Sequence, residues 1–509
     1  MIEPAQTYEQ AIGFLFERTN FERTPASGNQ DFKIGRMRRL LELLDNPQDR
    51  LPSVHIAGTK GKGSTAIMLA EILSAAGVRT GLYTSPHVEA FEERMQVAGQ
   101  RPTPDQIVEL VRRVQVAVRQ CESASSPFSP TFFEVTTALA WLFFESQRAE
   151  IVVLEVGLGG RLDSTNVCSP IACVLTTISR DHTQLLGSTL TQIASEKAGI
   201  VKPRVPVISG VQGREAQEVI VEVCRRQQAE LWQLSADAGI TVGGSRTRES
   251  SDRSLTTSAT TVIDSFRYEH TPNARENADR DADTFGSVTV TTPTTHWPAM
   301  PLTLAGEHQA HNAAAALATI DKLRQLSWKV SSEAARTGMS RVRWPMRIEV
   351  VARRPTVIVD AGHNWESISA LGRTIEESFS NVSPEHRASR RVLIFAATKD
   401  KDVVGMTRQL LPRFDSVILT QYLNNPRAVP VESLRRIVQS VSDSPCHVAA
   451  TPAEAWQLAR RITTPDDLIC VTGSFFIAAE MRDLIFRDVE RGGFEVTKAT
   501  DSTMCRLDR

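Results

Sequence analysis

The sequence predicts an α/β fold in two domains: a P-loop-type N-terminal domain on a mainly parallel sheet, and a smaller Rossmann-like C-terminal domain. Short apolar runs of strand length alternate with longer helix-like segments, a pattern typical of βα units. The run Ser53–Ala57 leads into a glycine-rich stretch and then into a helical one. With 509 residues, the chain is also longer than one hydrophobic core usually serves.

The first domain starts its alternation at Ser53–Ala57, after which we expect a helix near Thr65–Ala76 and a strand around Thr80–Tyr83. Further strands are expected at Ile151–Val156, Ile171–Thr176 and Val205–Ser209.

Two more helices follow from local patterns in this domain. The run Val135–Phe144 is too short for a membrane span and predicts a buried helix. Thr189 and Gln192 have capping-box spacing, so a helix is expected over Thr189–Ala198, with Gly199 suited to its C-terminal end.

Residues from about 236 to 298 differ from the rest in composition. Stretches such as GGSRTRESSDRSLTTSATT and NARENADRDADT are polar, with few large apolar side chains and no helical period. We expect a loop or partly disordered insertion there, in which Ser287–Thr291 could still form a strand. The predicted domains are therefore residues 1–338 with this insertion and residues 339–496, followed by a tail, 497–509.

The second domain follows an alanine-rich helix expected near Gln309–Leu326. Its strands are expected at Val357–Val359, Val392–Ala396, Ser416–Leu419 and Leu468–Val471.

Composition narrows the class of protein. The chain is 41% hydrophobic with a net charge of −1, so it offers no general electrostatic attraction to nucleic acid or to an anionic membrane. Its 7 cysteines are scattered without a CxxC pair, which favours reduced thiols over a disulfide framework or a zinc site. The start MIEPAQTYEQ lacks an apolar core typical of a secretory signal. We expect a cytoplasmic protein with no nucleic-acid or membrane partner, acting as a monomer.

The stretch HIAGTKGKGST, residues 55–65, has the composition of a phosphate-binding loop. Small residues between a strand and a helix let backbone N–H groups converge on phosphate, a lysine neutralises charge, and a hydroxyl can reach Mg²⁺. The spacing departs from GxxxxGK[ST], because Ile56 stands five residues before Gly61 and Gly63 separates Lys62 from Ser64. A glycine-rich turn without a phosphate therefore remains an alternative for the stretch alone.

The stretch GTKGKGS, with this unusual spacing, resembles the GTxGKG[ST] loop of the folylpolyglutamate synthase/dihydrofolate synthase family, within the Mur ligase superfamily. Further blocks resemble that family in its order along most of the chain, outside about 236–298 and the last dozen residues. The blocks are GRMRRLLELLDNPQ, TSPHVEAFEER, TFFEVTTALAWLFF, LEVGLGGRLDSTN, DHTQLLG, SEKAGIVKP, DAGHN and NPRA.

The resemblance implies two Mg²⁺ ions and ATP as co-substrate. Ser85, Glu155 and His182 match metal-ligand positions, and Lys197 matches a lysine that carries a CO₂-derived carbamate. Together with Lys62, the residues Glu155, His182 and Lys197 are the catalytic candidates. From the residues alone, the alternatives are a turn serine before a proline for Ser85, a strand-end acid for Glu155 and a hydrogen-bonded histidine for His182. For Lys197 a solvated lysine paired with a nearby acid is the default interpretation.

Two further sets of binding residues are implied by the resemblance. The ATP set comprises Gly58, Thr59, Lys60, Gly61, Lys62, Gly63, Ser64, Thr65, Asn312, Arg347, Asp360 and His363. Arg347 lies in RWPMRIEV, where Met346 replaces the glycine of a pattern usually read PGR, so the backbone conformation there is an open question.

The set expected to bind the folate or pteroate substrate comprises Phe32, Lys33, Ile34, Thr131, Phe132, Phe133, Glu134, Leu162, Asp163 and Ser164. Aromatic faces can stack on a flat heterocycle, and Asp163 could hydrogen-bond its nitrogens, while core packing remains the alternative for the two phenylalanines. Lys399, Asp400 and Arg427 are candidate helpers for L-glutamate.

The resemblance therefore implies that the protein is an ATP- and Mg²⁺-dependent ligase. It would add L-glutamate to a folate-type carboxylate through an acyl phosphate. Tetrahydrofolate polyglutamylation and the glutamylation of dihydropteroate both fit, and the TFFE and GRLDSTN blocks favour an enzyme with both activities. One alternative is a Mur-type peptide ligase of cell-wall synthesis, although fewer residues precede Gly58 than its extra substrate domain needs. The other alternative is a catalytically inactive ATP-binding relative. The presence of the full set of catalytic candidates argues against it: Lys62, Glu155, His182 and Lys197.

Overall fold

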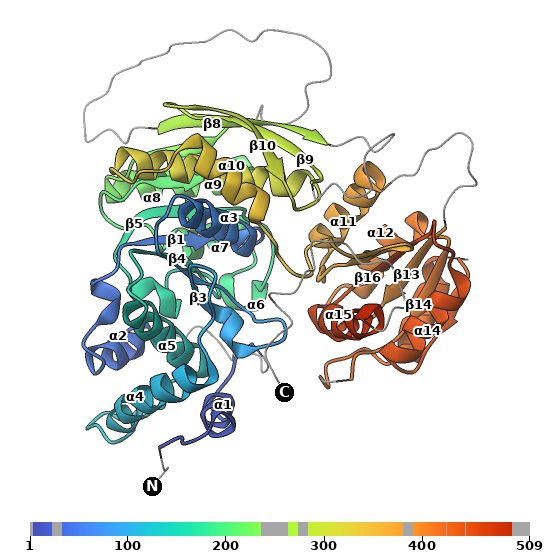
Figure 1. Ribbon diagram of the computed structural model, residues 1–509, viewed down its shortest axis with the longest axis horizontal. Helices are drawn as coiled ribbons and strands as arrows, with labels where there is room; N and C mark the ends of the chain where they lie inside the picture. Colours follow the sequence, from blue (N-terminus) through green and yellow to red (C-terminus); the bar gives the residue numbers. More distant parts are fainter. Residues whose placement is uncertain are drawn as a thin grey trace. The chain divides into compact units, whose positions relative to one another are not determined.

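The computed structural model describes residues 4–22, 33–235, 263–272, 284–379, 390–423, 425–442 and 444–490, and Figure 1 traces its elements. Contacts divide the chain into two compact units. The first contains Met1–His270, Val288–Met300 and Ala310–Val342, and the second contains Thr271–Ser287, Pro301–Gln309 and the chain from Arg343 onward.

A ten-stranded sheet, most of which belongs to the first unit, has the strand order β10-β9-β8-β7-β6-β5-β1-β4-β2-β3. The strands are β1 Ser53–Ala57, β2 Thr80–Tyr83, β3 Met95–Val97, β4 Ile151–Glu155, β5 Pro170–Leu175, β6 Val207–Ser209, β7 Leu231–Leu234, β8 Ile263–Pro272, β9 Gly286–Thr291 and β10 His296–Leu302. Strand β1 pairs in parallel with β4 on one side and with β5 on the other. The carboxyl ends of these three strands therefore meet at one edge, where ligands of α/β proteins commonly bind.

The predicted strands and helices of this unit are confirmed to within a few residues, with one correction. Residues 263–272 and 284–298 are largely strand rather than loop, because β8, β9 and β10 extend the sheet, as Figure 1 shows. The alternating buried and half-buried positions of β9 explain how so polar a sequence can pair. The strand expected at Ser287–Thr291 is confirmed, and residues 236–262 and 273–283 lie outside the described residues.

Helices pack around this sheet. They are α1 Tyr8–Phe16, α2 Ile34–Glu42, α3 Lys62–Ala75, α4 Pro104–Glu122, α5 Phe132–Ser146, α6 Thr183–Leu186, α7 Leu190–Ala198, α8 Arg214–Gln227, α9 Glu307–Gln325 and α10 Ser332–Arg341, with short 3₁₀ turns η2 Pro47–Asp49, η3 Phe91–Arg94 and η4 Ser164–Val167. Four of them begin with a threonine capping box, at Thr7, Thr103, Thr131 and Thr189. Each threonine accepts the N–H three residues on, which satisfies one of the unpaired donors at a helix start.

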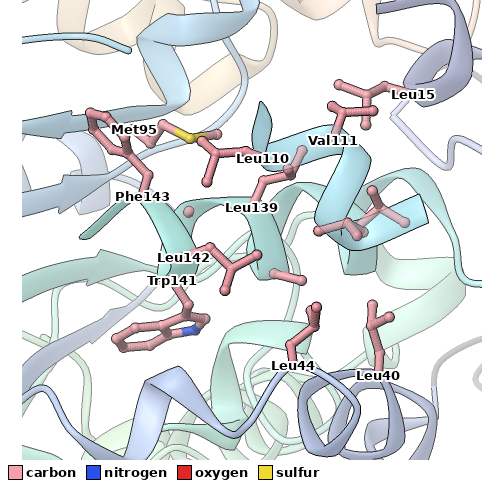
Figure 2. Packing of buried hydrophobic residues seen from close by; sticks show 14 of the residues in the cluster. Leu15, Leu40, Leu44, Met95, Leu110, Val111, Leu139, Trp141, Leu142 and Phe143 are labelled. Carbon is pink, nitrogen blue, oxygen red and sulfur yellow. The ribbon is translucent and has the colours of Figure 1, made fainter. Parts of the chain in front are cut away.

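The core beside α5 explains why the apolar run Val135–Phe144 is a helix interior. Figure 2 shows Leu15, Leu40, Leu110 and Leu139, which come from α1, α2, α4 and α5, with the ring of Trp141 at the lower left of the view. All five side chains are at most 5% exposed. None of the helices in the described ranges combines the length and the apolar character that a membrane crossing requires.

The second unit has a six-stranded sheet with the order β11-β12-β16-β13-β14-β15, parallel except for the β11–β12 pair. Its elements are β11 Glu349–Arg353, β12 Thr356–Val359, α11 Trp365–Ser378, β13 Arg391–Phe395, α12 Val403–Leu410, η5 Leu411–Arg413, β14 Ser416–Leu419, α13 Val431–Val441, β15 Cys446–Val448, α14 Pro452–Ile462, β16 Leu468–Thr472 and α15 Phe475–Glu490. All four strands predicted there are confirmed.

Candidate active site

The loop between β1 and α3 has a backbone that requires glycine at two positions. Gly58 and Gly61 have φ values of +156° and +85°. A Cβ on Gly58 would lie 1.9 Å from Oγ1 of Thr176, and one on Gly61 would lie 2.2 Å from Oδ1 of Asn312. The sequence prediction that Asn312 belongs with this loop is thus matched by direct proximity, although helix α9 lies far away along the chain.

Hydrogen bonds join the loop to the segment that follows β5. The N–H of Thr59 donates to the carbonyl of Thr177 (2.7 Å), and the N–H of Lys60 donates to Oγ1 of Thr177 (2.9 Å). In return, the hydroxyl of Thr176 donates to the carbonyl of Lys60 (2.6 Å). These hydrogen bonds fix the backbone of the loop against the segment after β5.

An ion pair extends this junction to the predicted metal ligand His182. Nζ of Lys60 lies 2.8 Å from Oδ2 of Asp181, and the N–H of His182 donates to Oδ1 of the same carboxylate (3.0 Å). His182 itself has φ +51° and a half-exposed side chain. Sequence reasoning missed Asp181, although it stands next to His182 in the DHTQLLG block.

Lys62 and Glu155 face each other at the ends of neighbouring elements. Nζ of Lys62 lies 3.9 Å from Oε1 of Glu155, and both side chains are largely buried. The other carboxylate oxygen accepts the N–H of Ser85 (3.3 Å). Oγ1 of Thr65, in the first turn of α3, is buried without a protein partner among the described residues.

These oxygens suit a hard cation. A carboxylate, hydroxyls and water are the ligands Mg²⁺ prefers, and the phosphates of a nucleotide complete its shell. Nowhere in the described ranges do three or more His, Cys, Asp or Glu side chains gather into a metal cluster.

Lys197 lies near the C-terminal end of α7, beneath the loop. It is 5% exposed, and its Nζ donates to the carbonyl of Gly58 (2.9 Å). Burial, assisted by the nearby charge of Lys62, lowers the pKa of Lys197 to about 7. A solvated lysine, the default interpretation of the sequence, is therefore wrong for this position. The capping box of Thr189 and Gln192 is confirmed.

Position 199, after the last residue of α7, is a glycine for a reason that the sequence did not reveal. Its φ is −62°, so it does not use the left-handed conformation expected of a terminal glycine. A Cβ there would instead lie 2.4 Å from Cβ of Arg161. Close packing between α7 and the loop after β4 selects glycine at this position.

The segments expected to bind folate lie close to one another in the first unit. Helix α2, which begins at Ile34 after the exposed Lys33, contacts both α5 and η4. Arg36 joins two of the segments, since its Nη2 lies 2.9 Å from the carboxylate of Glu134. The same carboxylate accepts the N–H and hydroxyl of Thr131. Phe32 lies outside the described residues.

The two phenylalanines of TFFE have different surroundings. Phe132 is fully buried, stacked on Phe16 at 5.3 Å with Arg94 over the ring. Core packing accounts for it. Phe133 is only partly buried, and its ring lies so close to Gly157 that a Cβ there would be 2.4 Å away. Of the pair, Phe133 has the more accessible face.

Asp163 is 5% exposed and begins η4, while Leu162 and Ser164 flank it. Its carboxylate accepts the N–H of Leu158 on one oxygen and the N–H of Thr165 on the other, both at 2.9 Å. Burial raises its pKa, although these hydrogen bonds oppose that shift. Asp163 therefore holds the loop after β4 in addition to any contact with a substrate.

In the second unit, Arg347 sits between two strained residues. Met346 and Ile348 have φ values of +55° and +51°, so Met346 adopts the conformation a glycine would take there. The N–H of Ile348 donates to Oδ2 of Asp360 (3.1 Å), and the N–H of Ala361 donates to the carbonyl of Met346 (2.9 Å). The substitution for glycine thus leaves the turn intact at a cost in backbone strain.

Asp360 and His363 follow β12. Burial raises the pKa of Asp360, against the opposing charge of Arg347, and its Oδ1 accepts the N–H of Gly362. Nδ1 of His363 lies 2.9 Å from the carbonyl of Ala361. Arg347, Asp360 and His363 therefore share one turn of this unit, as the blocks of sequence suggested.

Polar side chains also gather after β13, β14 and β16. Arg427 lies 2.7 Å from Asp400, and Nζ of Lys399 donates to the carbonyl of Pro426. Behind them, the hydroxyl of Tyr422 donates to Thr398 at 3.0 Å. Sequence reasoning missed Tyr422, because a lone tyrosine between two blocks carries no spacing signal.

The chain matches two known domain families and several curated and solved proteins. Residues 56–320 match the Mur ligase middle domain, and residues 346–475 match the Mur ligase glutamate ligase domain. Folylpolyglutamate synthase of Lacticaseibacillus casei is 30% identical over 89% of this chain and 95% of its own length. Among solved structures, Mycobacterium tuberculosis folylpolyglutamate synthase complexed with ADP has a TM-score of 0.77 and 29% identity, covering 94% of this chain and 98% of that one.

A second solved structure, E. coli FolC in complex with DHPP and ADP, has a TM-score of 0.75 and 26% identity, covering 96% of this chain and all of that chain (100%). The fold and the loop after β1 define an ATP-dependent ligase of the Mur type. Within that class, the chain belongs to the folylpolyglutamate synthase/dihydrofolate synthase family.

Proposed function

We propose that this ligase adds L-glutamate to folate-type carboxylates and accepts both tetrahydrofolate and dihydropteroate. The observation that carries the proposal is the placement of Lys62, Glu155 and Lys197 around one preformed phosphate loop. The relation to E. coli FolC, which binds DHPP together with ADP, supports the second acceptor. The clustering of the TFFE and GRLDSTN segments beside α2 supports it as well.

The chemistry starts from an unreactive acid. A carboxylate has no useful leaving group, so its oxygen attacks the γ-phosphorus of ATP, forming an acyl phosphate and releasing ADP. The neutral amine of glutamate then attacks the acyl carbon, phosphate leaves with the C–O bond electrons, and the nitrogen loses one proton to phosphate or water as the amide forms. No side-chain nucleophile is needed. Catalysis consists of positioning the reactants and neutralising the phosphate charge.

The protein's own groups have distinct parts in that scheme. Lys62 neutralises the transferring phosphoryl group, and the N–H groups of the loop after β1 orient the other phosphates. When two Mg²⁺ ions are bound, they add charge neutralisation, with Ser85 and Glu155 holding one and His182 the other. Asn312, Arg347, Asp360 and His363 bind the nucleotide, and Lys399, Asp400 and Arg427 assist glutamate.

Lys197 is proposed to carry a carbamate. A carbamate forms when a neutral amine attacks CO₂, which makes an N–C bond and releases a proton. The lowered pKa of Lys197 gives a large neutral fraction at pH 7, which an ordinary lysine lacks. The product is an anionic oxygen donor within the electrostatic influence of Lys62 and Lys60.

The test is phosphate release by the purified chain with ATP, Mg²⁺ and glutamate, measured separately with dihydropteroate and tetrahydrofolate. We expect turnover with each acceptor and none without glutamate. K62M should abolish both reactions, whereas K399M should mainly raise the KM for glutamate. Turnover with one acceptor only would reduce the proposal to a single activity. ATP binding without turnover would favour the inactive relative, and turnover only with a nucleotide-linked peptide would favour the Mur-type peptide ligase.

The proposal also includes a monomer that works in the cytoplasm. Light scattering of the purified chain should give a mass near the 56.1 kDa of one chain. A mass of two or more chains would contradict this part alone.

A further inference from the structure

A buried histidine in β1 is connected by hydrogen bonds to the loop after β4. His55 lies at the centre of the strand that ends at the phosphate loop, and its side chain is fully buried. Its Nε2 lies 2.9 Å from Oγ1 of Thr165, a residue of η4 that is also fully buried. Thr165 in turn contacts Asp163. None of the functions assigned above uses His55 or Thr165.

The direction of each hydrogen bond follows from the donors available. The hydroxyl and the N–H of Thr165 both donate to Oδ1 of Asp163. Since a hydroxyl has one hydrogen, Oγ1 of Thr165 can only accept from His55. Burial keeps the imidazole neutral, with its pKa lowered to about 3, so its one N–H must be on Nε2.

This arrangement leaves one defined position on the Asp163 carboxylate. A carboxylate has about four lone-pair positions, of which Oδ1 uses two for Thr165 and Oδ2 uses one for Leu158. The remaining lone pair belongs to Oδ2. A ring N–H or amino group of a pteridine is a donor of the matching kind.

We propose that His55 and Thr165 are positioning residues for the acceptor substrate, and that the chain His55–Thr165–Asp163 aims Oδ2 of Asp163 at the pteridine ring. This inference rests on the proposed function, because Asp163 needs a pteridine-bearing substrate to recognise. His55 stands three residues before Gly58 in the sequence. The same strand, β1, therefore supports both the phosphate loop and the acceptor contact.

The test compares Thr165→Val, which keeps the shape but removes the hydroxyl, with Thr165→Ser, which restores it. We expect T165V to raise the KM for dihydropteroate about tenfold, the cost of one hydrogen bond to a charged group, with the KM for ATP unchanged within about twofold. T165S should return the acceptor KM to near its original value. T319V is the matched control, because Thr319 is a fully buried threonine whose hydroxyl donates to the carbonyl of Ala315 in α9.

A merely structural role for Thr165 predicts a different result. T165V would then lower the melting temperature and change both KM values together, or change neither, and either outcome overturns the inference. Absence of any ligation by the unsubstituted chain would instead contradict the proposed function, so the two failures are distinguishable.

A second measurement does not depend on activity or on the folding of T165V. The ¹⁵N NMR spectrum of the full chain, labelled at its 10 histidines, identifies His55 by comparison with H55Q. We expect a neutral imidazole protonated on Nε2 throughout pH 5–8. A cationic ring, or the proton on Nδ1, would overturn the proposed direction of the hydrogen bonds.

Discussion

Lys197 shows how a single residue acquires chemistry from its surroundings. An ordinary lysine is protonated at neutral pH, but removal from water disfavours the charged form and the cation of Lys62 adds repulsion. The hydrogen bond to the carbonyl of Gly58 leaves the amine oriented toward the phosphate loop. Sequence alone could not show this, because the burial comes from the packing of α7 against α8 and into the core that both helices share with β5.

The first prediction concerns carbamylation of this residue. Because CO₂ reacts with the neutral amine, occupancy should rise with pH through about 7. Addition of ¹³C-bicarbonate should give a carbamate NMR signal in the unsubstituted chain and none in K197Q. K202Q is the matched control, since burial also lowers the pKa of Lys202, whose Nζ donates to the side chain of Asn166 instead. Retention of the signal in K197Q, or its loss in K202Q, would contradict the assignment.

Met346 and Ile348 illustrate backbone strain at the residue scale. Left-handed φ values at a methionine and at a β-branched isoleucine each cost about 1–3 kcal/mol. Both side chains are at most 3% exposed, so hydrophobic burial offsets that cost. The result fixes Arg347 between them, beside Asp360.

At the scale of elements, the candidate site depends on where strands and helices end. The carboxyl ends of β1, β4 and β5 bring Gly58, Glu155 and Thr176 together, since these strands pair in parallel. Helix α7 brings Lys197 beneath them, and its start is fixed by the capping box of Thr189. The position of Lys197 therefore depends on the N-terminal end of α7 at Thr189, which lies about two helical turns away.

The second prediction tests that dependence with two similar caps. T189A should cost about 1 kcal/mol of the free energy of unfolding, and so should T103A at the start of α4, because each removes the same capping interaction. Only T189A should also lower kcat, since α4 carries none of the candidate catalytic residues. Urea unfolding and turnover of both variants check this. Equal kcat losses would show that the effect is one of general stability.

At the scale of the whole molecule, a buried neutral histidine links stability to pH. His55 has a pKa of about 3 when folded and an ordinary value of 6.5 when exposed. Below pH 6.5 the unfolded chain therefore binds a proton that the folded chain does not. Folding is opposed progressively as the pH falls from 6.5 toward 3.

The third prediction follows from that difference. Between pH 7.5 and pH 5 the His55 contribution should lower the free energy of unfolding by about 2 kcal/mol, and H55Q should lack this part of the pH dependence. Asp163, whose pKa is raised, acts in the opposite direction, so the comparison is made against H55Q, which retains it. Urea unfolding of both proteins at the two pH values measures the difference. Parallel pH profiles would contradict the buried neutral state.

Much of the fold could be predicted from local patterns. Strands β1, β2 and β14 match the predicted ranges, because short apolar runs between turn residues are strong signals. Strands β8 and β10 were missed, because β8 is largely polar and β10 contains two prolines, and neither composition is typical of a strand. The closeness of Asn312 to Gly61 was implied by resemblance to a family, and no spacing in the sequence could have supplied it.

The sequence by itself determined the order of βα units, the glycine-rich loop with its lysine, the capped helices and the membership of a ligase family. These features depend on neighbouring residues, whose conformational preferences and side-chain chemistry can be read along the chain. Only the tertiary structure decided that Lys197 is buried, that Phe132 belongs to the core and that His55, Thr165 and Asp163 form one hydrogen-bonded chain. Each of those depends on desolvation and on contacts between segments distant in sequence, which arise only when parallel strands bring their ends together.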